Sequence, residues 1–161
     1  QGGAAQKISD WGLDYVDDLS WMNESRVVFT GNNELNDMRT PWKQTNIFSL
    51  DLNSKVVETI SPKNGVYKKP VVSPDSQRIA FLGTESRDYS SVAFDLWIHS
   101  NNSARKITED LSSTPEEVFW TSNQTLVINL DEKGSRRLKS INTKTTQTPT
   151  PTATKTARPT N

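Results

Sequence analysis

Three stretches of this 161-residue chain follow one outline, and this repetition constrains the fold more than any other feature of the sequence. Each stretch has one or two apolar residues, then a short polar turn, then a run of residues that favour β-strands. The outline is clearest in Val72–Phe81, and Ser20–Phe29 and Phe119–Ile128 are fainter copies. The copies follow one another at intervals of roughly 50 residues, which is typical of architectures built from repeated β-units.

One repeat unit contains about four strand signals. Pro74–Ser76 is a turn, because proline presets φ and the Asp and Ser side chains bond their own backbone. The β-rich run Arg78–Leu82 follows as an inner strand, and Asp95–Ile98 alternates polar and apolar residues as a half-solvated strand does. Asn101–Ser103 is the next turn, and Lys106–Thr108 closes the unit. Four short antiparallel strands are the content of one propeller blade, so we predict an all-β chain that forms part of a β-propeller with about three such blades.

The repeat also divides the chain. The predicted parts are a partial propeller over residues 1–144, with blades at about 15–61, 66–110 and 116–144, and a Thr/Pro-rich tail or linker over 145–161. Gln6–Ser9 looks like the closing strand of a preceding unit. The tail cannot bury a core, so we expect it to be extended and disordered. Propellers close with about four to eight blades, so we expect a longer parent chain, a ring completed by another polypeptide, or an open arc.

Charge and composition exclude several classes of protein. The formal net charge is +0 and the pI is about 6.8, whereas nucleic-acid-binding domains usually have a basic patch and a high pI, so we expect no nucleic-acid partner. The chain has no cysteine, which excludes disulfides and thiolate metal sites. No apolar run approaches the roughly 20 residues of a membrane helix, so no transmembrane segment is expected. The Thr/Pro tail favours an extracytoplasmic or cell-surface location without fixing the compartment.

No part of the sequence has the pattern of an active site. The one histidine, His99, ends a predicted strand beside Ser100 and past Asp95, and we expect it to be structural or exposed. Gly83–Arg87 lacks the G-x-S-x-G arrangement of a nucleophile elbow, and no phosphate-binding or dinucleotide-binding glycine motif is present. We therefore predict no catalytic residue, no cofactor-binding residue and no cofactor.

Acidic side chains gather in two regions of the sequence. They are Asp14, Asp17, Asp18, Glu109, Asp110, Glu116 and Glu117. Paired carboxylates can do acid–base work or bind a hard cation, but neither region has a calcium-loop pattern. We expect solvated turns there and no metal site.

Two loops and three sequons complete the polar features. Residues 31–44 and 84–93 separate strands of the first two units, as solvated loops or as loops that face a partner or ligand. N-x-[ST] sequons occur at Asn23, Asn101 and Asn123, all in predicted turns where a glycan would be tolerated.

The repeat motifs resemble a known family. Ser73–Phe81 is similar to the "SPDG-k-x-IAF" signature of WD40-like repeats in TolB-type propellers, with Ser76 in place of the usual glycine. Asp95–Ile98 and Arg105–Thr108 resemble the later strands of the same repeat. Such repeats also build the propeller of prolyl-oligopeptidase-family serine peptidases. Trp21–Thr30 resembles the acylaminoacyl-peptidase-like members most, as does the loop that carries Arg87, Asp88 and Tyr89 after Ile79–Gly83.

The resemblance implies a role in substrate access. In those peptidases the propeller precedes an α/β-hydrolase domain and filters substrates by size, while the catalytic Ser, Asp and His lie in the second domain. No catalytic residue carries over to this chain, which we therefore expect not to be an enzyme by itself. The first hypothesis is a non-catalytic propeller segment that gates or scaffolds substrate access, with a peptide, further blades or a hydrolase domain as its partner. The alternative is a TolB-like protein-interaction module at the cell surface or in the periplasm. A third hypothesis, an independent hydrolase, is disfavoured because the sequence has no catalytic triad.

Overall fold

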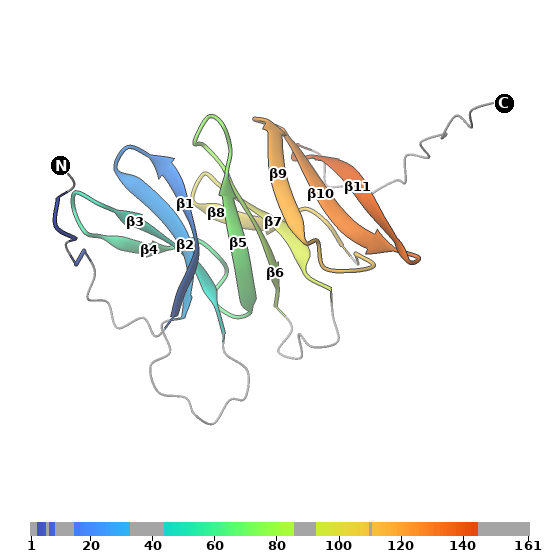
Figure 1. The fold of residues 1–161 in the computed structure, drawn as a ribbon, viewed down its shortest axis with the longest axis horizontal. Helices are drawn as coiled ribbons and strands as arrows, with labels where there is room; N and C mark the ends of the chain where they lie inside the picture. Colours follow the sequence, from blue (N-terminus) through green and yellow to red (C-terminus); the bar gives the residue numbers. More distant parts are fainter. Residues whose placement is uncertain are drawn as a thin grey trace, which may run out of the picture.

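The computed structural model of the chain describes residues 3–5, 7–8, 15–32, 44–85, 93–109 and 111–144. Within these ranges all regular structure is β, with eleven strands in three antiparallel sheets and no helix (Figure 1). The predicted fold class, part of an all-β propeller, is confirmed.

The first two sheets have four strands each, in chain order. Sheet 1 consists of β1 (Tyr15–Asn23), β2 (Arg26–Asn32), β3 (Asn46–Asp51) and β4 (Val57–Thr59). Sheet 2 consists of β5 (Val66–Val72), β6 (Ile79–Thr84), β7 (Asp95–Ser100) and β8 (Ser103–Lys106). The clearest copy of the repeat therefore spans the end of β5, the turn after it and the start of β6, which is an interior strand of its sheet.

The third sheet has fewer described strands than the other two. It contains β9 (Glu117–Ser122), β10 (Thr125–Glu132) and β11 (Ser135–Asn142), so its described part has three strands instead of four. The sequence after Lys144 is rich in threonine and proline. These residues lie outside the part of the chain that the structure describes.

The three sheets pack face to face in chain order. Their first strands stand side by side, with β5 in contact with both β1 and β9 (Figure 1). Neighbouring blades of a propeller have this arrangement, in which the first strands surround the central axis. The side of these strands that faces the axis is therefore the inner surface of the arc.

Apolar side chains fill both spaces between the sheets. Between sheets 1 and 2, Val28 and Ile47 meet an aromatic group in which the Tyr67 ring stands edge-on to Trp97, with centroids 5.7 Å apart. Between sheets 2 and 3, alternate residues of β6 and β7 meet alternate residues of β10 in one continuous cluster. A fully buried aliphatic or aromatic side chain contributes about 2 kcal/mol, so these two layers hold the arc together.

A hydroxyl group closes each of the first two sheets after its fourth strand. Thr108 Oγ1 donates to Asp95 Oδ1 at 3.0 Å and accepts from the Leu96 backbone N–H at 2.8 Å. Ser61 Oγ makes the corresponding pair of bonds in sheet 1, with the Asn46 side chain (3.2 Å) and the backbone N–H that follows it (3.1 Å). The closing segment is thereby joined to the start of the third strand, which satisfies buried polar groups there.

The N-terminal closing strand expected at Gln6–Ser9 is not formed in the part that the structure describes. Lys7 and Ile8 belong to no strand, and the Ile8 side chain is 47% exposed. Gln6 and Ser9 lie outside the described residues, as do the Thr/Pro segment 145–161 and the loop residues 33–43 and 86–92.

Candidate functional site

The inner surface of the arc has an open cavity of about 330 Å³. It is lined by residues 18–20 of β1, 69–71 of β5 and 117–118 of β9, so all three sheets contribute to it. Because each lining segment lies on the first strand of its sheet, the propeller fold itself brings them together.

Charged residues of alternating sign line this cavity, one from each sheet: Asp18, Lys69 and Glu117. The strands β1 and β5 each have a register shift next to the charged residue, where Asp18 and Lys69 adopt φ of 52° and 54°. Bulges of this kind change the direction of a side chain and are frequent beside functional sites. The same irregularity therefore recurs at one place in two successive repeats.

Asp18 links the first two sheets. Its Oδ2 atom accepts a hydrogen bond from Thr30 Oγ1 at 3.1 Å and one from the Lys69 backbone N–H at 2.9 Å. Thr30 is buried in the same sheet, whereas Lys69 belongs to the next one. The carboxylate is held by two donors, so its position in the cavity wall is fixed.

Hydrogen bonds also link sheets 2 and 3 beside the cavity. Lys69 Nζ donates to the Glu116 backbone carbonyl, and Trp120 Nε1 donates to the Val71 carbonyl at 3.0 Å. The Glu117 backbone N–H donates to Asn129 Oδ1 at 2.7 Å, while the Glu117 side chain is exposed at the rim. The lysine is thus tied to the wall, and the Glu117 carboxylate faces solvent.

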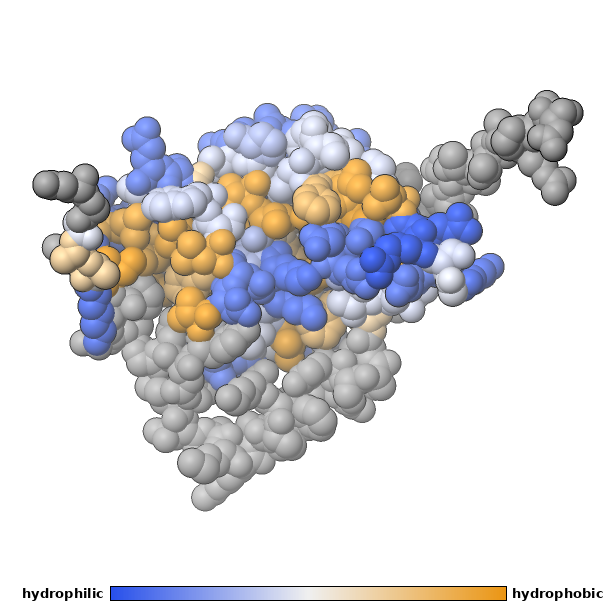
Figure 2. Space-filling model, viewed as in Figure 1, coloured by the Kyte–Doolittle hydropathy of each residue, from blue (hydrophilic) through white to orange (hydrophobic). Residues whose placement is uncertain are grey.

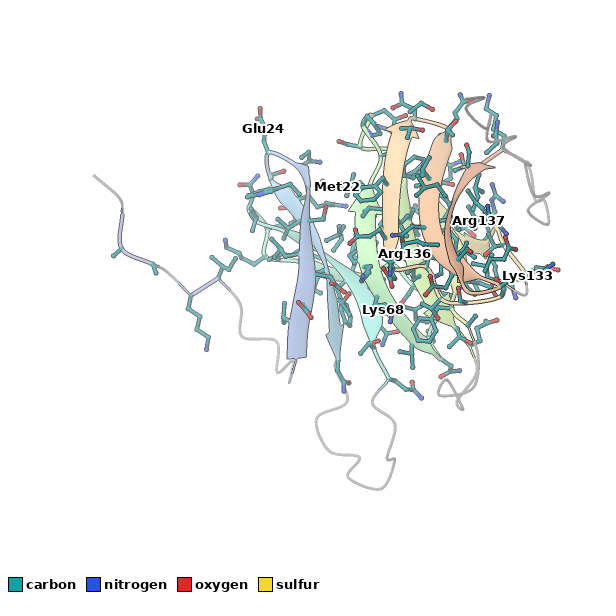
Figure 3. All side chains as sticks on the ribbon, turned by 45° about the vertical axis from the view of Figure 1, so that its right-hand side comes forward. Met22, Glu24, Lys68, Lys133, Arg136 and Arg137 are labelled. Carbon is teal, nitrogen blue, oxygen red and sulfur yellow. The ribbon has the colours of Figure 1, made fainter. Side chains whose placement is uncertain are left out.

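Lys68, the neighbour of Lys69, has a different environment. Burial lowers the pKa of its ammonium group, and the adjacent Lys69 charge lowers it further, while Asp18 acts in the opposite direction. Its Nζ atom lies 4.6 Å from the centroid of the Phe94 ring, a cation–π contact. Lys68, which is labelled in Figure 3, therefore helps to pack sheet 2. It is not among the residues that line the cavity.

The inner strands also carry exposed apolar side chains. Leu19 and Trp21 of β1 are each 62% exposed, and Phe119 of β9 is 55% exposed. Figure 2 shows apolar surface over the β1 side of the molecule and hydrophilic surface across the centre and over the β11 side. A cavity lined by both charged residues and the apolar residues Leu19, Pro70 and Val118 suits a ligand with both polar backbone and apolar side chains, such as a peptide.

His99, the one histidine, is half-buried on β7 and away from this cavity. Burial lowers the pKa of its imidazole, and the Glu58 charge opposes that shift. No hydrogen bond joins it to a nucleophile or an acid within the described ranges. Asp95 is held by Thr108 and by an ion pair with Lys106 at 3.5 Å, so it stabilises sheet 2.

The acidic residues that form two regions in the sequence are grouped differently in the folded chain. Asp18 and Glu117, which belong to separate acidic regions, line the same cavity. Glu116 instead bonds Arg136 at 2.8 Å. Asp17 and Glu109 are exposed, and Asp14 and Asp110 lie outside the described residues. In the described ranges, no group of three or more acidic or histidine side chains is placed to hold a metal ion.

Sequence reasoning missed Lys69 as a site residue. The signal that could have identified it is the repeat itself, because Asp18 and Lys69 precede Arg26 and Arg78 by nearly the same number of residues. The bulge that turns these residues toward the axis leaves no mark in the hydrophobic pattern, since it depends on the pairing register.

A basic strand forms the other charged surface. Lys133, Arg136, Arg137 and Lys139 lie on or beside β11 (Figure 3). Arg136 is paired with Glu116, and Lys139 Nζ lies 3.0 Å from Glu132 Oε1. Nearby carboxylates therefore offset part of the positive charge.

The part of the chain that the structure describes has no helix long and apolar enough to cross a membrane.

Comparisons with known proteins agree with this architecture. No family model matches the chain. Among curated proteins, dipeptidyl-peptidase 5 of Arthroderma otae is 33% identical over 98 residues, which cover 53% of this chain and 14% of the relative. The probable dipeptidyl-peptidase 5 of Trichophyton verrucosum is 30% identical over 98 residues with the same coverage. The matched region is therefore a small part of these relatives.

Solved structures show the same fold. The β-propeller domain of the trilobed protease from Pyrococcus furiosus has a TM-score of 0.60 and 19% identity, over 81% of this chain and 39% of that one. Acylaminoacyl peptidase from Pyrococcus horikoshii has a TM-score of 0.59 and 15% identity, over 81% and 23%. TolB from Acinetobacter baumannii has a TM-score of 0.58 and 14% identity, over 83% and 31%. The resemblance to TolB-type and peptidase propellers is confirmed at the level of the fold.

Proposed function

We propose that this chain is a non-catalytic β-propeller segment of a prolyl-oligopeptidase-family, peptidase-like protein, in which it gates or scaffolds the access of peptides to a catalytic domain. The 33% identity to a dipeptidyl-peptidase over 98 residues is the observation that carries this proposal. The remainder of such a protein would supply further blades and the hydrolase domain.

The cavity on the inner surface gives the proposal a physical basis. A peptide in this cavity would meet Asp18, Lys69 and Glu117, one from each sheet. The backbone amides and charged termini of the peptide could pair with charged cavity residues of either sign. Its apolar side chains would contact Leu19 and Pro70. Because the hydrogen bonds of Asp18 fix the wall, we expect it to select peptides by size and charge without closing around them.

A second candidate function is supported by a different observation. The match to TolB covers 83% of this chain, so a protein-interaction module is the alternative role. The sequence of the full-length gene separates the two. A downstream G-x-S-x-G motif followed by Asp and His supports the peptidase, whereas further blades without that motif support the interaction module.

Assays on the purified chain test the first proposal. We expect no hydrolysis of dipeptidyl p-nitroanilide substrates. We also expect weak binding of mixed-sequence hexapeptides, followed by the intrinsic tryptophan fluorescence of the chain. Glu117→Gln should weaken that binding several-fold, because it removes the solvent-facing carboxylate of the cavity, while Glu24→Gln on the β1–β2 turn should leave it unchanged.

Two results would contradict the proposal. Turnover that survives purification and is lost on substitution of His99 would make the chain an enzyme. Binding of a folded protein partner, without any binding of short peptides, would favour the interaction module.

A further inference from the structure

The antiparallel strand order gives the arc two distinct ends. The turns β1–β2, β3–β4, β5–β6, β7–β8 and β9–β10 lie at one end, here called the hairpin end. The links β2–β3, β4–β5 and β6–β7 leave from the opposite end, here called the connection end (Figure 1). Contacts between turns agree with this assignment, since the Leu52 N–H donates to the Ser25 carbonyl at 2.7 Å and Arg78 donates to the Asn123 carbonyl.

All three sequons lie at the hairpin end. Asn23 is the last residue of β1, Asn101 is in the β7–β8 turn, and Asn123 is in the β9–β10 turn. All three residues are exposed. Glu24, the middle residue of the first sequon, points away from the sheets at the tip of its hairpin (Figure 3). A glycan at any of these positions would extend into solvent without displacing a packed side chain.

Turn geometry explains why asparagine is accepted at these places. Asn101 and Asn102 have φ of 50° and 59°, the left-handed conformations of a two-residue hairpin turn that asparagine tolerates. Asn23 Oδ1 accepts bonds from the backbone N–H and the hydroxyl of Ser25, at 3.0 and 3.3 Å. Turn preference accounts for the asparagines but does not require a hydroxyl residue two places later.

The connection end provides the contrast. Asn64, which precedes β5 at that end, is also exposed, but Val66 stands two residues later, so no sequon exists there. Among the described asparagines, the three in sequons are all exposed and all at one end, and buried Asn32 and Asn46 are in none.

We propose that this chain is an N-glycoprotein whose glycans are confined to the hairpin end, on Asn23, Asn101 and Asn123. In the modification, the side-chain amide nitrogen forms a bond to the anomeric carbon of a lipid-linked oligosaccharide. The bond from that carbon to the pyrophosphate carrier breaks, the lipid pyrophosphate leaves, and the amide proton passes to a base of the transferase. The connection end and the cavity of the inner surface stay free of carbohydrate.

The test is the intact mass of the full chain, secreted from a eukaryotic host, before and after an amidase that removes N-glycans. Ser25→Ala, Ser103→Ala and Thr125→Ala should each remove the mass of one glycan, because each destroys one sequon. Ser25→Thr and Ser103→Thr are matched controls that keep the sequon, and both should keep the glycan. Circular dichroism of each secreted form should show the same β-structure, which places the glycans on folded protein.

A further variant makes a negative result decisive. Val66→Thr adds a sequon at Asn64, at the connection end, and shows whether the host modifies exposed asparagines of this fold. Occupancy of two or three native sequons supports the proposal. Occupancy of none or one, while Asn64 of the Val66→Thr variant is modified, overturns it.

Discussion

At the scale of single residues, backbone conformation explains the central turn of the repeat. Ser73 and Arg78 are joined by backbone and side-chain hydrogen bonds of 2.9 Å, and the Asp75 carboxylate accepts from the Gln77 N–H at 3.1 Å. The Ser73 hydroxyl also donates to Asp75, and this bond is the largest cause that lowers the pKa of the carboxyl. Ser76, however, adopts φ of 57°, a left-handed conformation that glycine tolerates better.

Ser76→Gly should therefore stabilise the protein. A left-handed conformation costs a residue with a Cβ about 1–2 kcal/mol, and the entropy of a glycine in the unfolded chain offsets part of that gain. We expect the free energy of unfolding, measured by urea denaturation, to rise by about 1 kcal/mol. Ser140→Gly on β11 is the control, because its φ is not positive and the change should lower stability by a similar amount. A loss of stability in Ser76→Gly would mean that this turn is not strained.

At the scale of the strands, one cross-strand pair fixes the register of sheet 2. Tyr67 of β5 pairs with Gly83 of β6, and its ring lies across the glycine, where a Cβ would come within 2.1 Å of Tyr67 Cδ1. The phenol donates to the Asn64 carbonyl at 3.1 Å, and burial raises its pKa above the usual range. Trp97 Nε1 donates to the Gly83 carbonyl at 3.1 Å, so a second aromatic side chain is held against this glycine.

Gly83→Ala should destabilise the protein by about 3 kcal/mol, because overpacking of a buried site forces side chains and backbone apart. The measurement is the midpoint of urea or thermal unfolding. Gly3→Ala is the control, since nothing lies within 4 Å of the added methyl group and its φ is not positive. Equal stability of the two variants would show that Tyr67 does not lie over Gly83.

At the scale of the whole molecule, the repeat predicted the architecture but not the site. Turn residues and alternating apolar runs identify strands locally, so the strands around Val72–Phe81 could be read from the sequence. The cavity depends on contacts between three sheets and on two bulges, which no local pattern encodes. For that reason Asp18 and Glu117 looked like members of separate solvated turns, and Lys69 was not recognised.

The way in which the sheets are closed is a second feature that the sequence pattern does not reveal. In the third sheet, β10 and β11 follow the pattern of the other sheets, and the described residues form three strands. In sheets 1 and 2, Ser61 and Thr108 join the closing segment to the start of the third strand. Such a hydroxyl bond spans more than ten residues of sequence, so only the folded structure identifies it.

We propose that the inner surface of the propeller arc is the functional site of this chain. Amide chemical-shift mapping by NMR during titration with mixed-sequence hexapeptides tests it most directly. We predict that the largest shifts fall on residues 18–20, 69–71 and 117–118, and that Glu117→Gln reduces them. Shifts centred on His99 or on the hairpin end, or no shifts at millimolar peptide, would contradict the claim.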